Sequence, residues 1–156
     1  MDKNARILVI DDDENIRKVL VAILTDEGYL VDSVGTAKGA LEKTKKQFYN
    51  VALIDVRLPD MEGIELLTKF KPTTPKMRKI IITGYPTLQN AILAVNGGAD
   101  AYIMKPFDVE KVLRIIEEQL KEQENEKHFS QEKVAEFIET RVRELDTHKE
   151  VNTKRA

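Results

Sequence analysis

Residues 50–63 read NVALIDVRLPDMEG. The apolar run 51–54 stops at Asp55, and two turn-forming residues, Pro59 and Gly63, follow it. A short, unbroken apolar run between turn signals is typical of a strand buried on both faces of a parallel sheet. Asp55 then lies at the carboxyl end of that strand, which is the edge where open α/β folds bind their ligands.

Four other apolar runs repeat this arrangement, at residues 7–10, 30–34, 80–82 and 101–104. The second of them alternates more and contains Asp32 and Ser33, so we expect it at an edge of the sheet. Asp11, Thr83 and Lys105 directly follow the other three. Because helical patterns separate the runs, the chain predicts a doubly wound α/β fold with a five-stranded parallel sheet. Right-handed crossovers would bring these strand ends to one edge.

The segments between the strands carry apolar residues at helical spacing. Gly28 is placed to end the first helix, Thr36 to cap the second and Asp108 to cap the fifth. The fourth helix has an apolar stripe formed by Leu88, Ala91, Ile92 and Val95. Every expected strand is thus followed by an amphipathic helix.

The composition is that of a globular protein. Hydrophobic residues make up 42% of the 156 residues, which suits one domain plus an extension. The net charge of −2 gives no general electrostatic reason to bind nucleic acid or a membrane. Cysteine is absent, which excludes disulfides and thiolate metal sites. Residues 1–4 lack the apolar stretch of a signal peptide, and no apolar run is long enough to span a bilayer, so we expect a soluble, cytoplasmic protein.

Three carboxylates, those of Asp11, Asp12 and Asp55, are expected close together at the strand ends. Like charges at short range repel strongly unless a pKa rises or a cation binds. Oxygen ligands with no histidine or cysteine nearby favour Mg²⁺ or a similar hard ion. Lys105 adds a positive charge and Thr83 a hydroxyl donor, so the group suits a tetrahedral anion. Asp55 is therefore a candidate nucleophile for phosphoryl transfer.

Each of these residues also has an ordinary structural explanation. An isolated aspartate after a strand is commonly a turn or cap residue, and Asp12 or Asp13 is expected to cap the first helix. Thr83 and Lys105 each begin an ordinary loop. Their joint occurrence at strand ends of a five-fold strand–helix alternation favours the functional site.

In this combination the motifs resemble the receiver domain of two-component response regulators. The resemblance covers about residues 5–122 and is carried by Asp11, Asp12, Asp55, Pro59, Gly63, Thr83, Lys105 and Pro106. It implies a flavodoxin/CheY-like fold with strand order 2-1-3-4-5. It also implies that a histidine kinase donates a phosphoryl group and that a downstream protein target responds to it.

The resemblance assigns a role to each site residue. Asp55 would be the phosphoacceptor, and Asp11 or Asp12, or both, would hold Mg²⁺ with Asp55 and the backbone carbonyl of Arg57. Lys105 would pair with the acceptor carboxylate or its phosphoryl oxygens. The peptide bond after Lys105 is one that the family keeps cis, a state available mainly before proline.

The resemblance also implies a switch. Phosphorylation adds about −1.5 to −2 charges at one point. Thr83 would move to bond a phosphoryl oxygen, and Tyr102 would turn into the vacated space. The surface formed by the helix 88–95, the fifth strand and the fifth helix would then change. The coupling free energy between phosphorylation and this change would be about 1–3 kcal/mol.

Some positions depart from the family or vary within it. Asn50 stands where an aspartate is frequent. Arg57 and Tyr85 occupy positions that tune dephosphorylation in the family, so the sequence leaves the phosphoryl lifetime open. Asp13 extends the acidic run and obscures which two members bind the metal.

The composition shifts near residue 122. We expect a receiver at 1–122, then a charged linker and a C-terminal amphipathic helix within 123–156, with Ser130 as its cap. Its apolar positions are Val134, Phe137, Ile138, Val142 and Leu145. This helix packs on the domain, pairs in a homodimer, or links to a missing output domain. The first two favour a single-domain regulator, and the third an N-terminal receiver fragment of a longer transcriptional regulator. No basic stripe for direct nucleic-acid binding is present.

Three other functions compete with the switch. An aspartyl-phosphate phosphatase of the haloacid dehalogenase type needs a second aspartate two residues after the nucleophile, where this chain has Arg57. A flavodoxin-like nucleotide-binding module needs a phosphate-binding loop after the first strand, where this chain has Asp11 and its acidic neighbours. An unphosphorylated scaffold usually lacks a site residue, and none is missing here. We therefore expect a phosphoacceptor switch that assists its own phosphorylation and dephosphorylation, not an enzyme.

Overall fold

The computed structural model describes residues 4–155, with side chains up to residue 145. Strands and helices alternate along the chain: β1 Arg6–Ile10, α1 Glu14–Asp26, β2 Leu30–Val34, α2 Ala37–Lys46, β3 Val51–Asp55, α3 Gly63–Leu67, β4 Arg78–Thr83, α4 Leu88–Asn96, β5 Ala101–Met104 and α5 Val109–Arg155. Contacts divide the chain into two units, Met1–Gln123 and Glu124–Ala156.

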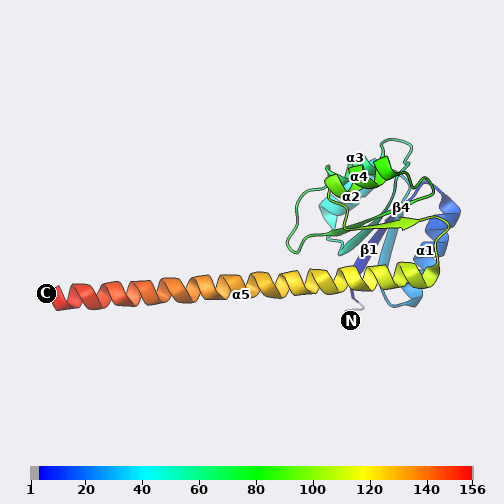
Figure 1. Cartoon of the computed structure of the whole chain (residues 1–156). Helices are drawn as coiled ribbons and strands as arrows, with labels where there is room; N and C mark the ends of the chain where they lie inside the picture. The colour runs from blue at the N-terminus through cyan, green and yellow to red at the C-terminus, as the bar shows by residue number, and fades with distance from the viewer. Residues whose placement is uncertain (1–3, 156) are drawn as a thin grey trace. The chain divides into compact units, whose positions relative to one another are not determined.

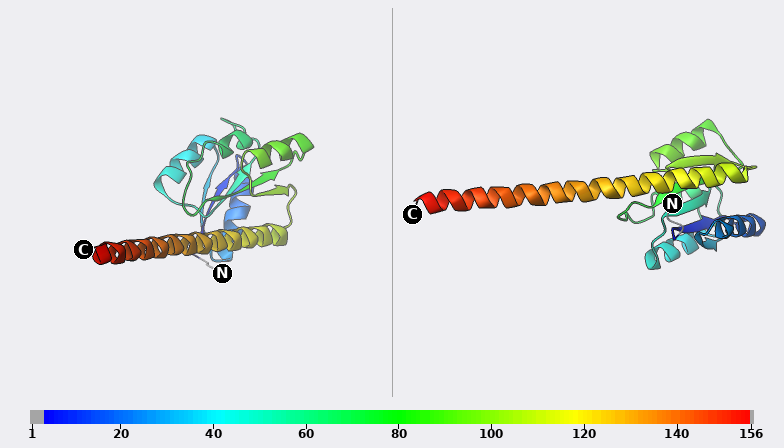
Figure 2. Two further views of the ribbon diagram at one scale, coloured as in Figure 1. Left: turned by 60° about the vertical axis from the view of Figure 1, so that its left-hand side comes forward. Right: turned by 90° about the horizontal axis from the view of Figure 1, so that it is seen from below.

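The first unit contains one parallel sheet in the order β2-β1-β3-β4-β5. The predicted fold class and strand order are therefore confirmed, and β2 lies at an edge as expected. Alternate side chains of β1 and β3 point to opposite faces, which suits the two-residue period of a strand. Leu8 and Ile54 join a core with α2, α3 and α4, whereas Val9 and Leu53 join one with α1 and α5. Figures 1 and 2 show α4 and α1 on opposite sides of the sheet.

The helix boundaries follow local chemistry. The Asp13 side chain accepts hydrogen bonds from the backbone N–H groups of Asn15 and Ile16 at the start of α1. Thr36 caps α2, and Asp108 accepts from the N–H of Glu110 at the start of α5, as the sequence predicts. Asp13 is thereby occupied as a helix cap, so Asp11 and Asp12 remain as the metal-binding candidates of the acidic run.

The apolar stripe of α4 faces solvent. Leu88 is 79% exposed, Ile92 51% and Val95 70%, whereas Ala94 is the buried residue of this helix. An apolar stripe at helical spacing normally faces a core. The small Ala94 side chain instead packs α4 against the sheet, and the first unit therefore presents a hydrophobic helix face.

Helix α5 corrects the expectation for the tail. A charged linker and a new helix capped by Ser130 are both wrong, because α5 runs without interruption from Val109 to Arg155. The residues of the expected linker are mainly glutamate, lysine and glutamine, which are good helix formers and carry the helix onward. In the second unit the apolar side chains are exposed, namely Phe129, Val134, Phe137, Ile138, Val142 and Leu145. No helix within residues 4–155 has the length and apolarity needed to cross a membrane.

Candidate functional site

Three carboxylates meet at the carboxyl edge of the sheet. Asp11 and Asp12 follow β1, and Asp55 ends β3 on the neighbouring strand. One oxygen from each lies within 4.8 Å of the others. Asp11 is buried and Asp12 is exposed, so the group opens to solvent on one side. Three oxygen donors at this spacing fit a hard divalent cation such as Mg²⁺.

Lys105 supplies the opposite charge. Its Nζ lies 2.8 Å from Asp11 Oδ2 and 3.5 Å from Asp55 Oδ1. Burial lowers the pKa of Lys105, but its hydrogen bond to Asp11 and the attraction of both carboxylates outweigh burial and raise that pKa. The Lys105–Pro106 peptide bond is cis, as the resemblance implies. The backbone N–H of Lys105 donates to the Thr83 carbonyl at 2.7 Å and so ties the ends of β4 and β5 together.

The surroundings of Asp55 disfavour the charged form of its carboxyl group. Burial and the nearby Asp11 charge raise the pKa of Asp55 to about 6, and Asp12 adds to the rise. The Lys105 ammonium and a hydrogen bond from the Arg57 backbone N–H act in the opposite direction. A second positive charge at this point would relieve the repulsion, which is the condition that a bound cation meets.

The hydroxyls of Thr83 and Tyr102 come from the two adjacent strands. Thr83 is fully buried at the end of β4, and its Oγ1 accepts a hydrogen bond from the Tyr85 backbone N–H at 2.9 Å. The Tyr102 hydroxyl is buried and makes no hydrogen bond with the described residues. Burial raises the pKa of Tyr102, and the nearby Thr83 hydroxyl partly offsets that rise. The two residues that the resemblance assigns to the switch are therefore neighbours.

The β3–α3 loop is folded tightly over the end of β3. The Gly63 N–H donates to the Val56 carbonyl at 2.6 Å, and Arg57 pairs with Glu62 in an isolated antiparallel bridge. A Cβ atom at position 63 would overlap the backbone carbonyl of Asp55. Only glycine fits at this close approach.

Two contacts at the site are not apparent from the sequence. The Arg57 guanidinium stacks on the Tyr85 ring, 3.7 Å from its centroid, and links the loops after β3 and β4. Arg17 Nη1 donates to the Asp11 carbonyl at 2.7 Å. Each contact joins residues of different elements, so periodicity and local motifs give no signal for them. The family resemblance marks positions 57 and 85 but not their contact.

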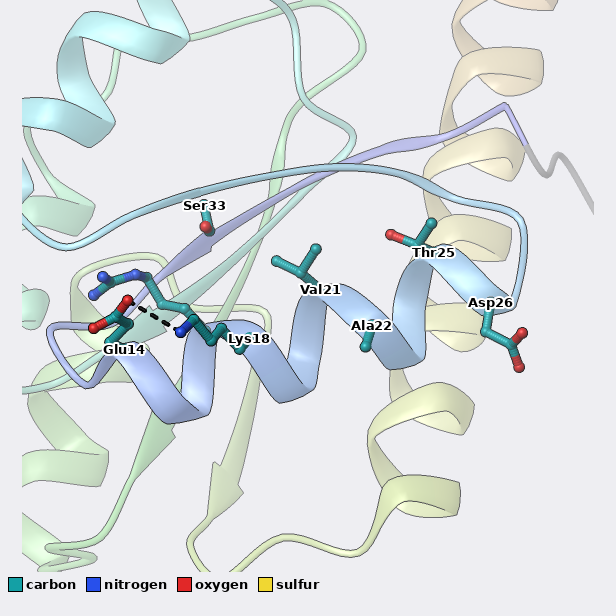
Figure 3. Close-up of a pocket in the computed structure, with 8 residues that line it drawn as sticks. Glu14, Lys18, Val21, Ala22, Thr25, Asp26 and Ser33 are labelled. Carbon is teal, nitrogen blue, oxygen red and sulfur yellow. Dashed lines mark ion pairs between the residues drawn. The ribbon is translucent and has the colours of Figure 1, made fainter.

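A large open hollow of about 780 Å³ lies beside the site rather than on it. It follows the α1 surface and is lined by Val21, Ala22 and Thr25 of that helix and by Ser33 of β2 (Figure 3). The carboxylates of Asp11, Asp12 and Asp55 do not line it.

Comparison with known proteins agrees with this geometry. Residues 7–117 match the family model of the response regulator receiver domain. The transcriptional regulatory protein ZraR of Klebsiella oxytoca is 35% identical over 114 residues, which are 73% of this chain and 26% of ZraR. The chain thus spans about a quarter of the length of the first curated relatives that it matches.

Solved structures give the same result. A CheY-like receiver domain protein from Methanospirillum hungatei JF-1 has 48% sequence identity and a TM-score of 0.76, over 79% of this chain and 98% of that one. The beryllofluoride-activated NtrC4 receiver domain dimer has 37% identity and a TM-score of 0.71, over 76% and 98% of the two chains. The chain therefore belongs to the family of response regulator receiver domains.

Proposed function

We propose that Asp55 accepts a phosphoryl group from a histidine kinase and that the chain is a phosphorylation-controlled switch rather than an enzyme with an external substrate. The convergence of Asp11, Asp12 and Asp55, with Lys105 Nζ within 3.5 Å of Asp55, is the observation that carries this proposal. Since the phosphodonor is a kinase histidine, we place the reaction in the cytoplasm.

The transfer is an in-line displacement. An Asp55 carboxylate oxygen attacks phosphorus, and the new P–O bond forms as the P–N bond to the kinase histidine breaks. The imidazole, protonated on its other nitrogen, leaves as the neutral base. Asp11, Asp12 and Asp55 would hold Mg²⁺ with the Arg57 carbonyl, and the ion would offset charge on the transferring group. The Lys105 ammonium adds a second, permanent positive charge beside the acceptor.

The switch uses the neighbouring hydroxyls. A phosphoryl group on Asp55 offers new acceptor oxygens, and Thr83 would turn its hydroxyl proton toward one of them. Tyr102, already buried beside Thr83, would respond in its orientation or mobility. These changes reach α4, whose exposed Leu88 and Ile92 would form part of the surface read by a downstream protein target.

The tail is proposed as an interaction segment. We draw the receiver boundary after Gln123, whose side chain is buried at 4% exposure, and assign 124–156 to the tail. The exposed apolar face around Phe137 and Ile138 supports homodimer formation through this helix. The short coverage of the curated relatives supports a second reading, in which the chain is the receiver part of a longer transcriptional regulator.

One experiment tests the phosphoacceptor role. The protein is incubated with acetyl phosphate and Mg²⁺, and its intact mass is measured. We expect a single phosphate-sized gain that is labile to base, absent from Asp55→Asn and absent without Mg²⁺. Asp60→Asn is the matched control, because Asp60 is a nearby aspartate that holds the start of α2 through the N–H groups of Ala37 and Lys38. No mass gain at saturating donor would exclude the proposal.

A further inference from the structure

A second, smaller cavity lies at the amino-terminal end of the strands, opposite the carboxyl edge where Asp55 lies. Its volume is about 270 Å³, and it is more enclosed than the hollow along α1. It opens between the last turns of α2 and the α3–β4 loop, beside Tyr49, which precedes β3. Tyr49 is six residues before Asp55, so at about 3.3 Å per residue the cavity is about 20 Å from the carboxylates. The proposed phosphoryl chemistry does not use it.

The floor of this cavity is apolar and rigid. Tyr49, Phe70 and Met77 are buried core residues that expose part of their surface to the cavity. The Tyr49 hydroxyl donates to Asp32 Oδ2 at 2.6 Å, which holds its ring in place. The Thr73 hydroxyl accepts from the Met77 N–H at 3.0 Å and donates to the Pro75 carbonyl at 2.8 Å, so it too is satisfied within the chain. The floor therefore offers hydrophobic contact rather than free hydrogen-bonding groups.

The rim carries positive charge only. Lys45, Lys69 and Lys71 line the cavity, and no aspartate or glutamate does so among the described residues. None of these three ammonium groups has a hydrogen-bond or ion-pair partner in the described part of the chain. Lys45 is in the last turn of α2, where the helix dipole favours a cation. Lys69 directly follows the C-cap of α3, where the dipole also favours a cation. Lys71 lies outside both helices, so the dipole does not explain it.

The volume of the cavity limits the size of the group that it can bind. Pockets for drug-sized ligands are roughly 300–1,000 Å³, and this one is below that range. It matches a single bulky side chain of the kind that anchors protein interfaces. We propose that the cavity docks an acidic segment of a partner protein, which inserts one aromatic side chain between α2 and the α3–β4 loop while its carboxylates pair with the three lysines.

Tryptophan fluorescence provides a direct test, because the chain contains no tryptophan. The probe is the synthetic peptide Ac-Glu-Asp-Trp-Glu-Asp-NH₂, added to the full chain at low salt. We expect a saturable blue shift of its emission and amide NMR shifts centred on Leu41, Thr44 and Thr73. A probe with lysine in place of its acidic residues should bind at least about tenfold more weakly, and added salt should weaken the acidic probe.

Substitutions localise the effect. Lys69→Glu with Lys71→Glu should reduce probe affinity by about tenfold or more. Lys43→Glu with Lys46→Glu makes the same double charge change on two α2 lysines that do not line the cavity, and it should not reduce the affinity. Thr44→Phe should abolish binding by filling the cavity without changing the charge. All variants should still accept phosphate at Asp55, which shows that they fold. No blue shift up to millimolar probe, equal binding of the lysine probe, or NMR shifts centred on α4 would each overturn the proposal.

Discussion

The folded protein places the Asp55 carboxylate in surroundings that disfavour its negative charge. Its pKa is raised from 3.8 to about 6, mainly by burial and by Asp11. Between these two pH values the folded state holds more protons than the unfolded state, so stability falls as pH rises. Above about pH 6 the whole cost is present, and a cation or a phosphoryl group with its cation would relieve it.

This cost should be visible in unfolding experiments without divalent cations. Asp55→Asn should gain stability relative to the wild type as pH rises from 4 to 6, by up to about 3 kcal/mol for a shift of about two pKa units. The difference should then level off and shrink when Mg²⁺ is added. Denaturant titrations of both proteins at several pH values measure it. A difference that does not change with pH would contradict the assigned pKa shift.

The buried Tyr102 hydroxyl gives a second prediction. Because it makes no geometric hydrogen bond with the described residues, the nearby Thr83 hydroxyl offsets only part of the cost of burying it. Tyr102→Phe should therefore raise the free energy of unfolding by about 1 kcal/mol. Asp55 should still accept phosphate, since the hydroxyl does not touch the acceptor. Thermal and denaturant unfolding test this, with Tyr85→Phe as a control on an exposed ring. A loss of stability would mean that the hydroxyl has a partner.

Among the elements, α5 is fastened to the sheet by side-chain amides. Gln123 Nε2 donates to the carbonyls of Asn50 and Lys76, at 3.0 and 2.8 Å. Its Oε1 must then be the acceptor, and it receives Asn50 Nδ2 at 2.9 Å. Asn50 Oδ1 accepts in turn from the Arg6 N–H. The family resemblance gave Asn50 no role, but this network needs a side chain that donates and accepts.

Aspartate at position 50 should break that network. Asn50→Asp places a carboxylate oxygen against Gln123 Oε1, and we expect a loss of about 1–3 kcal/mol. A double-mutant cycle measures the effect by urea unfolding: the penalty should shrink when Gln123 is already alanine. Equal penalties in both backgrounds would show that Gln123 is not the cause.

Helix α4 has one residue buried against the sheet and an apolar stripe exposed to solvent, so substitutions can test the two faces separately. Ala94 is buried at 1% exposure, whereas Leu88 is 79% exposed. Ala94→Leu should overpack the core and cost about 1–3 kcal/mol, while Leu88→Ser should stay within about 0.5 kcal/mol. Denaturant unfolding compares the two variants. A large loss for Leu88→Ser would show that the stripe is covered in solution.

For the whole molecule, the tail should be dispensable for the chemistry and required for association. A chain ending at residue 126 keeps Gln123 and its contacts, so it should fold and accept phosphate like the full chain. Sedimentation should show a monomer for this truncated chain and a dimer for the full chain if the exposed face of 124–155 pairs. The same state for both chains would remove the tail from the dimer proposal.

The sequence predicts the parts of this molecule that depend on order along the chain. Strand ends at Asp11, Asp55, Thr83 and Lys105 follow from alternation and crossover handedness, and the structure brings Asp11, Asp55 and Lys105 together. The contact of Arg57 with Tyr85 could not be predicted, because it depends on how two loops fold in space. The charged run near residue 122 predicts a linker by its composition, whereas the high helix propensity of glutamate, lysine and glutamine continues α5 through it. Periodicity identified the α4 stripe but carries no information on which side of it meets the sheet.

Gly63 is a residue that the site needs for its backbone geometry and not for any chemical group of its own. It has no side chain to offer a metal or a phosphoryl group, yet any side chain there would collide with the carbonyl of Asp55 and push the acceptor out of place. A mutational screen that scores only phosphoryl transfer would rank Gly63 beside Asp55 and Lys105. A parallel screen for folded protein would separate them, since loss at Gly63 would come from displaced backbone and loss at Asp55 from the absence of the proposed nucleophile.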